Sequence, residues 1–214
     1  MLGLHILDKN IIIKMKAISY RMTDDIGHAP CVFDSMQDLA ETTKRNYWKK
    51  GSNLLTLSCC ARNVRRMAEK DDLVLGIAGA IFQKKENRLI WIGRVDSILS
   101  KREYAIRYPN RPDSYYYDEN GIYVMDDNAF HDATNQESDL NPANTLLFKE
   151  FYYFGENAMC VTKNLVAKHY PCYINETKAH GFFERLQESH KSFGVYGVPN
   201  DLEANRDAII DWVG

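Results

Sequence analysis

The sequence has few of the features that identify a protein class on sight. It has no apolar run that approaches the roughly 20 residues of a membrane span. Neither charge predominates, since 27 Lys and Arg stand against 29 Asp and Glu. His5, Asp8 and Lys9 interrupt the only apolar opening, so we predict no signal peptide. These absences favour a soluble cytoplasmic protein with no membrane partner.

Recognisable metal and cofactor motifs are also missing. The five cysteines lie at positions 31, 59, 60, 160 and 172. An odd number with one adjacent pair favours reduced thiols over a disulfide framework. There is no CxxC and no close histidine pair of the kind that zinc sites usually show. GxGxxG is absent, and GIAG at 76–79 lacks the Gly-Lys-Ser/Thr ending of a phosphate loop. We therefore predict no metal and no cofactor.

What the chain does contain is enough apolar sequence for one substantial core. Of 214 residues, 45% are hydrophobic and 26% are charged, and 13 are Tyr. We predict an extension at 1–14 and one α+β domain over 15–214, closed by helical sequence at 166–214. Residues 1–70 carry 12 Lys/Arg against 7 Asp/Glu, whereas 71–214 carry 15 against 22. This asymmetry permits a local basic face that could meet a nucleic acid.

The central segment, residues 56–99, predicts a helix followed by two strands. Thr56 or Ser58 could cap a helix that runs to about Glu69. Three arginines at i, i+3 and i+4 are predicted to share one face of it: Arg62, Arg65 and Arg66. Guanidinium groups near a helix N-terminus suit a phosphate, although a solvated face bridged to nearby acids is the alternative.

Apolar segments predict the rest of the core. The sequence LVLGIAGAIF predicts a central strand, and its Gly76 and Gly79 would allow close approach of a backbone or a ligand. LIWIGRV would pair back antiparallel. TLLFKEFYYF predicts a further strand, and AHGFFERLQESH an amphipathic helix. These four segments occupy 73–82, 89–95, 145–154 and 179–190.

Two loops carry further candidate residues. The first follows the predicted strand at 11–21 and contains Gly27 and His28, where the alternative is an ordinary connection. The second is the long irregular segment 108–145, and such segments are usually functional or disordered. Tyrosine rings suit a flat base, so Tyr117 and Tyr123 of this loop and Tyr153 beyond it are nucleotide-binding candidates. Gly27 of the first loop is a further nucleotide-binding candidate.

The same long loop offers the only crowding of an imidazole and carboxylates. His131 and Asp127 could supply acid–base chemistry. A surface histidine among acids is the commoner arrangement. For Tyr153, core packing is likewise the alternative to a place in a pocket.

Several blocks of the sequence, in order, resemble a known family. They are YRMTDDIGHAP (20–30), LTLSCCARNVRRMAEKDDLVLGIAG (55–79), IWIGRVDSILSKREY (90–104), ENGIY (119–123) and FYYFGENA (151–158). This set is similar to the second of the nucleotide modification associated domain families and resembles the core of PUA-like domains, which include EVE and ASCH domains. The resemblance spans about 15–165. It implies a partly closed, mainly antiparallel PUA-like β-barrel with flanking helices, and an association with DNA base modification in phages or bacteria.

Two functions fit these residues. The first is a binding module that recognises a nucleotide, or a nucleic acid with a modified base, with phosphate on the arginines and the base on loop aromatics. It requires no catalytic set, and no complete catalytic motif is found, so we favour it. The alternative is an enzyme of nucleotide or base modification that uses His28 or His131 with acids of the long loop.

Overall fold

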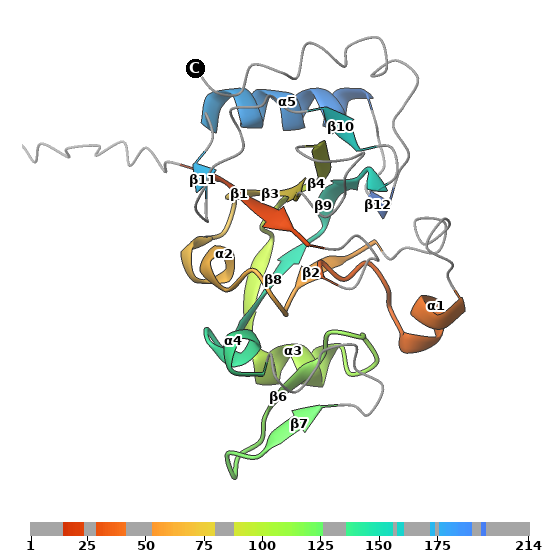
Figure 1. Cartoon of the computed structure of the whole chain (residues 1–214), viewed down its shortest axis with the longest axis vertical. Helices are drawn as coiled ribbons and strands as arrows, with labels where there is room; N and C mark the ends of the chain where they lie inside the picture. Colours follow the sequence, from red (N-terminus) through yellow and green to blue (C-terminus); the bar gives the residue numbers. More distant parts are fainter. Residues whose placement is uncertain are drawn as a thin grey trace, which may run out of the picture.

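The arrangement of strands and helices is seen in a computed structural model (Figure 1). It describes residues 15–23, 29–41, 53–79, 88–125, 136–155, 158–160, 172–173, 176–189 and 194–195. The helices of this part are α1 (Met36–Glu41), α2 (Arg62–Met67), α3 (Lys101–Arg107), α4 (Gln136–Leu140) and α5 (Glu176–Ser189). None of them is long and apolar enough to cross a bilayer.

The largest sheet is mainly antiparallel. Its strand order is β11 (Cys172–Tyr173), β1 (Ala17–Met22), β3 (Leu73–Ala78), β4 (Arg88–Arg94), β9 (Glu150–Tyr153) and β12 (Gly194–Val195), with β10 (Met159–Cys160) also paired to β4. Among the described strands of this sheet, only the β1–β3 and β9–β12 pairs are parallel. The predicted central strand is confirmed as β3, and its predicted antiparallel partner as β4.

Two smaller antiparallel sheets complete the described strands. One has the order β2 (Leu55–Leu57), β8 (Asn144–Phe148) and β5 (Ser97–Ser100), and the other is the hairpin of β6 (Tyr115–Tyr117) and β7 (Tyr123–Met125). The α+β class with mainly antiparallel sheets is therefore confirmed. Within the described ranges the large sheet has open ends at β11 and β12 and no barrel is closed, so the PUA-like barrel is not confirmed.

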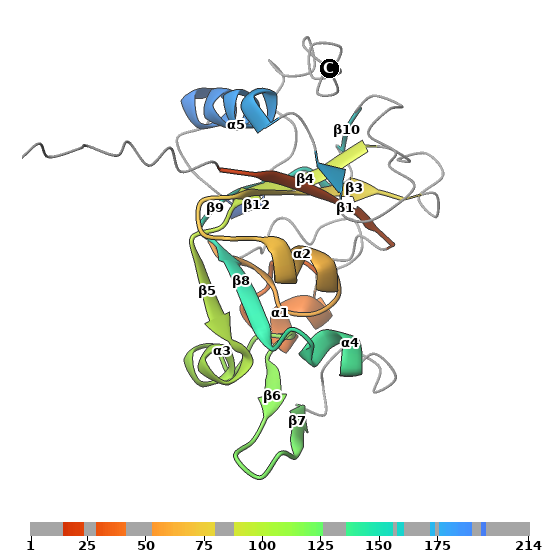
Figure 2. The same ribbon diagram turned by 90° about the vertical axis from the view of Figure 1, so that its left-hand side faces the viewer.

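The large sheet is covered on both faces (Figure 2). On one side α5 buries Phe182, Phe183 and Leu186 against apolar residues of β3, β4 and β9. On the other side lie α2 and the small β2–β8–β5 sheet, whose side chains share a core with Trp91. Because β3 is buried along its whole length, its sequence is apolar without alternation. The amphipathic helix predicted at 179–190 is confirmed as α5.

Gly76 of β3 is required by packing within this core. A Cβ atom there would lie 2.1 Å from Nε1 of Trp91 and 2.6 Å from Sδ of Met22. The sequence predicted that a backbone or a ligand would approach Gly76 closely. In the structure the groups that approach it are the side chains of Trp91 and Met22. A side chain on Gly79 would approach the backbone oxygen of Met22 at 2.8 Å.

Two predicted elements are wrong in their boundaries. Thr56 lies in β2, where its backbone N–H and carbonyl bond Cys31 at 3.0 and 2.8 Å, so it cannot cap a helix. The helix begins instead at Arg62, after Ala61 in the left-handed conformation with no side-chain cap. The segment 145–154 is not one strand, because β8 pairs with β2 and β5 whereas β9 pairs with β4.

Candidate functional site

Arg65 of α2 is an internal residue. Its side chain is 0% exposed. Nε donates to the carbonyl of Cys60 at 2.9 Å, and Nη2 to that of Ser138 at 2.9 Å. Nη1 donates to the carbonyls of Pro142 at 2.6 Å and Asn144 at 3.1 Å. The guanidinium therefore anchors α2 to the segment that joins α4 and β8.

Arg62 and Arg66 face a different environment from Arg65. Arg66 is exposed and Arg62 is half-buried. Neither has a hydrogen bond or an ion pair within the described part of the chain, and Nε of Arg62 is buried there without an acceptor. The structure thus separates the three arginines that the sequence placed on one face. Arg62 and Arg66, at i and i+4, still share one.

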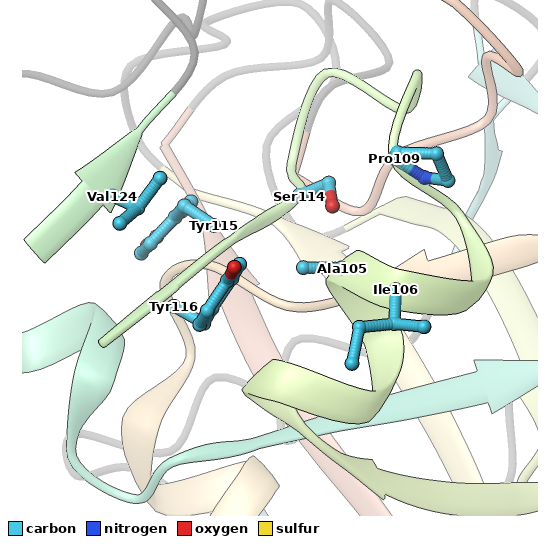
Figure 3. Close-up of a pocket in the computed structure, with 7 residues that line it drawn as sticks. All are labelled: Ala105, Ile106, Pro109, Ser114, Tyr115, Tyr116 and Val124. Atoms are coloured by element: carbon cyan, nitrogen blue, oxygen red, sulfur yellow. The ribbon is translucent and has the colours of Figure 1, made fainter. Parts of the chain in front are cut away.

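A pocket of about 300 Å³ lies between α3 and the β6–β7 hairpin (Figure 3). Its lining comes from α3, the loop that follows it and both hairpin strands: Ala105, Ile106, Pro109, Ser114, Tyr115, Tyr116 and Val124. Its volume is at the lower end of the range for small-molecule sites, and its lining is largely apolar with a few polar groups, as such sites usually are. Ile106 of this lining is 68% exposed.

The predicted tyrosines are not gathered at this pocket. Tyr117 is 46% exposed and is not part of the lining. Tyr123 pairs with Tyr117 in the hairpin, and its side chain lies outside the described residues. Tyr153 is fully buried in the core, as in the alternative reading of the sequence. Tyr116, which lines the pocket, was not among the residues predicted to bind a nucleotide. The only sequence signal for it is the alternation of side chains along the strand Tyr115–Tyr117, which puts Tyr116 on the opposite face from Tyr117.

The remaining candidates cannot be placed. Gly27, His28, Asp127 and His131 all lie outside the described residues. Among the residues that are described, no group of three or more His, Cys, Asp or Glu side chains is positioned to hold a metal ion.

A buried lysine lies beside the pocket lining. Lys101, at the start of α3, is 2% exposed and donates from Nζ to the backbone carbonyl and to Oγ of Ser58, the latter at 2.7 Å. Its Nζ also lies 4.8 Å from the centroid of the Tyr115 ring. No carboxylate pairs with it in the described part of the chain. Burial lowers the pKa of Lys101 to about 8.

A second buried network fixes the loop that forms one pocket wall. The hydroxyl of Tyr104 donates to Asp113 at 2.6 Å and accepts from Nε of Arg111 at 3.0 Å. Thr56 donates to the same carboxylate at 2.8 Å, and Arg111 forms an ion pair with Asp34 at 2.8 Å. Burial, with the nearby Asp113 charge, raises the pKa of Tyr104 well above its usual range. Arg111 and Asp113 thus tie the loop 108–114 to Tyr104 of α3, Thr56 of β2 and Asp34.

A comparison of the sequence with known families matches most of the chain. A family model described as nucleotide modification associated domain 2 matches residues 47–206, which is more than half of the chain. The matched range includes α2, the pocket and the members of both buried networks apart from Asp34. No curated protein and no solved structure matches the chain.

Proposed function

Because this chain belongs to the nucleotide modification associated domain 2 family, we propose that it binds a nucleotide or nucleic-acid ligand, with a base held in the pocket between α3 and the hairpin. The family description refers to nucleotide modification, and the binding of a ligand is our proposal. The observation that carries the proposal is the pocket itself. It combines apolar walls, two tyrosines and a volume suited to one small planar group.

Tyr116 is the residue that we assign to the base. It is half-buried, and in Figure 3 it lies with Ala105 and Ile106 around the space between β6 and α3. Stacking of a base on an aromatic side chain contributes about 1–3 kcal/mol and tolerates different bases. Ser114, also in the lining, offers a hydroxyl to the edge of a base.

Arg62 and Arg66 are assigned to phosphate. Guanidinium groups present planar donors that match phosphate oxygens, and neither side chain is occupied by an acid of the described chain. Arg65 then has a supporting role, because its bonds to carbonyl groups hold α2 in place. Catalysis by His28 or His131 with Asp127 stays a prediction from the sequence.

Binding measurements on two neighbouring tyrosines test the proposal. Wild type is titrated with nucleotides and with single strands of about 12 nucleotides that carry plain or 5-hydroxymethylated cytosine. Tyr116→Ala should weaken binding at least about 5-fold, the lower end of the stacking range. Tyr117→Ala is the matched control and should change affinity less than twofold, roughly, because Tyr117 is outside the lining. Equal effects of the two substitutions, or no binding by wild type, would contradict the proposal.

A further inference from the structure

Ser114 carries a hydroxyl group that the fold itself does not use. The residue is 7% exposed and lines the pocket between α3 and the hairpin. Within the described part of the chain its hydroxyl has no hydrogen bond, whereas the hydroxyls of the comparably buried Thr56 and Thr145 bond other polar side chains at 2.8 and 2.9 Å. Buried polar groups are normally paired, so an unpaired hydroxyl in a pocket wall is a place for a polar group of the ligand.

The backbone around Ser114 is held in place. Its N–H donates to the carbonyl of Arg111 at 3.0 Å. The preceding residue, Asp113, is 1% exposed and accepts a hydrogen bond from Tyr104 at 2.6 Å. In Figure 3 the oxygen of Ser114 points toward the side of α3 that carries Ala105. The hydroxyl therefore starts from a fixed backbone position, which reduces the entropy lost when it pairs with a ligand.

Among the described lining side chains, Ser114 alone offers a hydroxyl to the edge of a base stacked on Tyr116. The hydroxyl of Tyr115 is buried in the interior, with Cys59 and Asp139 as neighbours. That of Tyr116 lies in the plane of its own ring, so it is one layer away from the plane of the stacked base. The other four lining side chains are apolar: Ala105, Ile106, Pro109 and Val124. An edge that enters the pocket therefore meets one hydroxyl and otherwise apolar side chains.

This lining matches one edge of one class of base. The pairing edge of a pyrimidine carries several polar groups, and a purine has polar atoms on its other open edge as well. Entry by such an edge would leave polar groups unpaired, which weakens binding. The C5–C6 edge of a pyrimidine is apolar, but in a plain pyrimidine it offers nothing to Ser114. A hydroxymethyl group at C5 adds a single hydroxyl to that edge, which matches the single hydroxyl of the wall.

We infer that the pocket selects a pyrimidine whose 5-substituent ends in a hydroxyl, as in 5-hydroxymethylcytosine, and that Ser114 distinguishes it from the methylated base by a hydrogen bond to that hydroxyl. This inference rests on the proposed function and specifies its ligand. A hydroxyl both donates and accepts, so the two hydroxyls can pair in either direction. Tyr116 supplies affinity for any base by stacking, and Ser114 adds the preference among bases.

The test compares three single strands that differ at one central cytosine, which is plain, 5-methylated or 5-hydroxymethylated. The methylated strand is the reference, because it has the added carbon without the hydroxyl. Wild type should bind the hydroxymethylated strand about 5-fold more tightly than the methylated one, which is the net effect of one hydrogen bond. In Ser114→Ala this preference should disappear. The affinity of that variant for the methylated strand should stay within roughly twofold of wild type, because the Ser114 side chain makes no hydrogen bond within the described chain.

Ser97→Ala is the matched control and should keep the full preference. Ser97 lies in β5, outside the pocket lining, and its hydroxyl donates to Asp96 at 3.1 Å. The inference is overturned if wild type binds the methylated and hydroxymethylated strands equally, or if Ser114→Ala keeps the preference or loses binding to all three strands. In each case, wild-type binding that still requires Tyr116 leaves the proposed function standing. Absence of wild-type binding to every strand overturns both.

Discussion

Arg65 shows how burial changes the role of a charged side chain. Three arginines in one helical turn predict a cationic face, yet the middle one of the three makes four hydrogen bonds to backbone carbonyls inside the protein. Sequence spacing placed all three on one face, but the structure buries Arg65 and leaves Arg62 half-buried and Arg66 exposed. Sequence spacing could not show which side of the helix the segment before β8 covers, because that segment is about 75 residues further along the chain.

Arg65→Met should therefore act on stability. The substitution removes the donors for four carbonyls in the interior, so we expect the free energy of unfolding to fall by about 3 kcal/mol or more. Urea unfolding followed by circular dichroism measures this. Arg66→Gln on the same helix should stay within about 0.5 kcal/mol of wild type. A loss for Arg65→Met as small as that for Arg66→Gln would refute the anchoring role.

The lowered pKa of the buried Lys101 predicts that the stability of the protein depends on pH. Its pKa in the folded protein is about 8, below its ordinary value of 10.5, because burial disfavours the charged form. Between these values the unfolded chain holds the proton and the folded chain does not. The contribution of Lys101 to the free energy of unfolding therefore rises with pH across this window, by about 1 kcal/mol per pH unit.

The measurement compares wild type with Lys101→Met, which cannot titrate. Other buried groups lower the free energy of unfolding as the pH rises, because burial raises the pKa of a group such as Tyr115. These groups are present in both proteins, so the difference in stability between wild type and Lys101→Met reduces their effect. Wild type should gain stability relative to Lys101→Met from about pH 8 to about pH 9.5. A difference that stays constant over that range would mean that Lys101 keeps its ordinary pKa in the folded protein.

At the scale of elements, the sequence predicted the regular parts well. The apolar pattern located β3, β4 and α5. The failures are at boundaries. Residues 145–154 are apolar apart from Thr145 and the charged pair Lys149 and Glu150. That pair lies where the chain passes from the small sheet to the large one, and the prediction of a single strand overlooked it.

Substitution by alanine should change the stability of the protein in opposite directions at two glycines in different elements. Gly76→Ala places a methyl group against Trp91 and Met22 in the centre of the large sheet, and should cost about 3 kcal/mol or more. Gly181→Ala in α5 meets nothing closer than 3.9 Å and should stabilise the protein by about 0.5–1 kcal/mol through helix propensity. Thermal unfolding of both variants checks the signs. A neutral Gly76→Ala would show that the core has room beside Trp91.

For the whole molecule, the sequence indicated the family and the α+β class but not the position of the pocket. The pocket forms where α3 packs on a hairpin that begins in the irregular segment 108–145, so it depends on tertiary contacts rather than on any motif. The choice between Tyr116 and Tyr117 likewise depends on which face of β6 meets α3. The arginines of α2 could be named from the sequence because their identity and spacing are local.

Photo-crosslinking tests the central claim most directly. A single strand that carries 5-iodouracil is irradiated with the full-length protein, and the attached peptide is identified by mass spectrometry. Stacking in the pocket predicts a crosslink at Tyr116. The crosslink should be lost in Tyr116→Phe/Val124→Asp, because the added carboxylate repels the strand. It should be retained in Tyr117→Phe. A crosslink at α5, on the far face of the large sheet, with none in the pocket lining, would contradict the account.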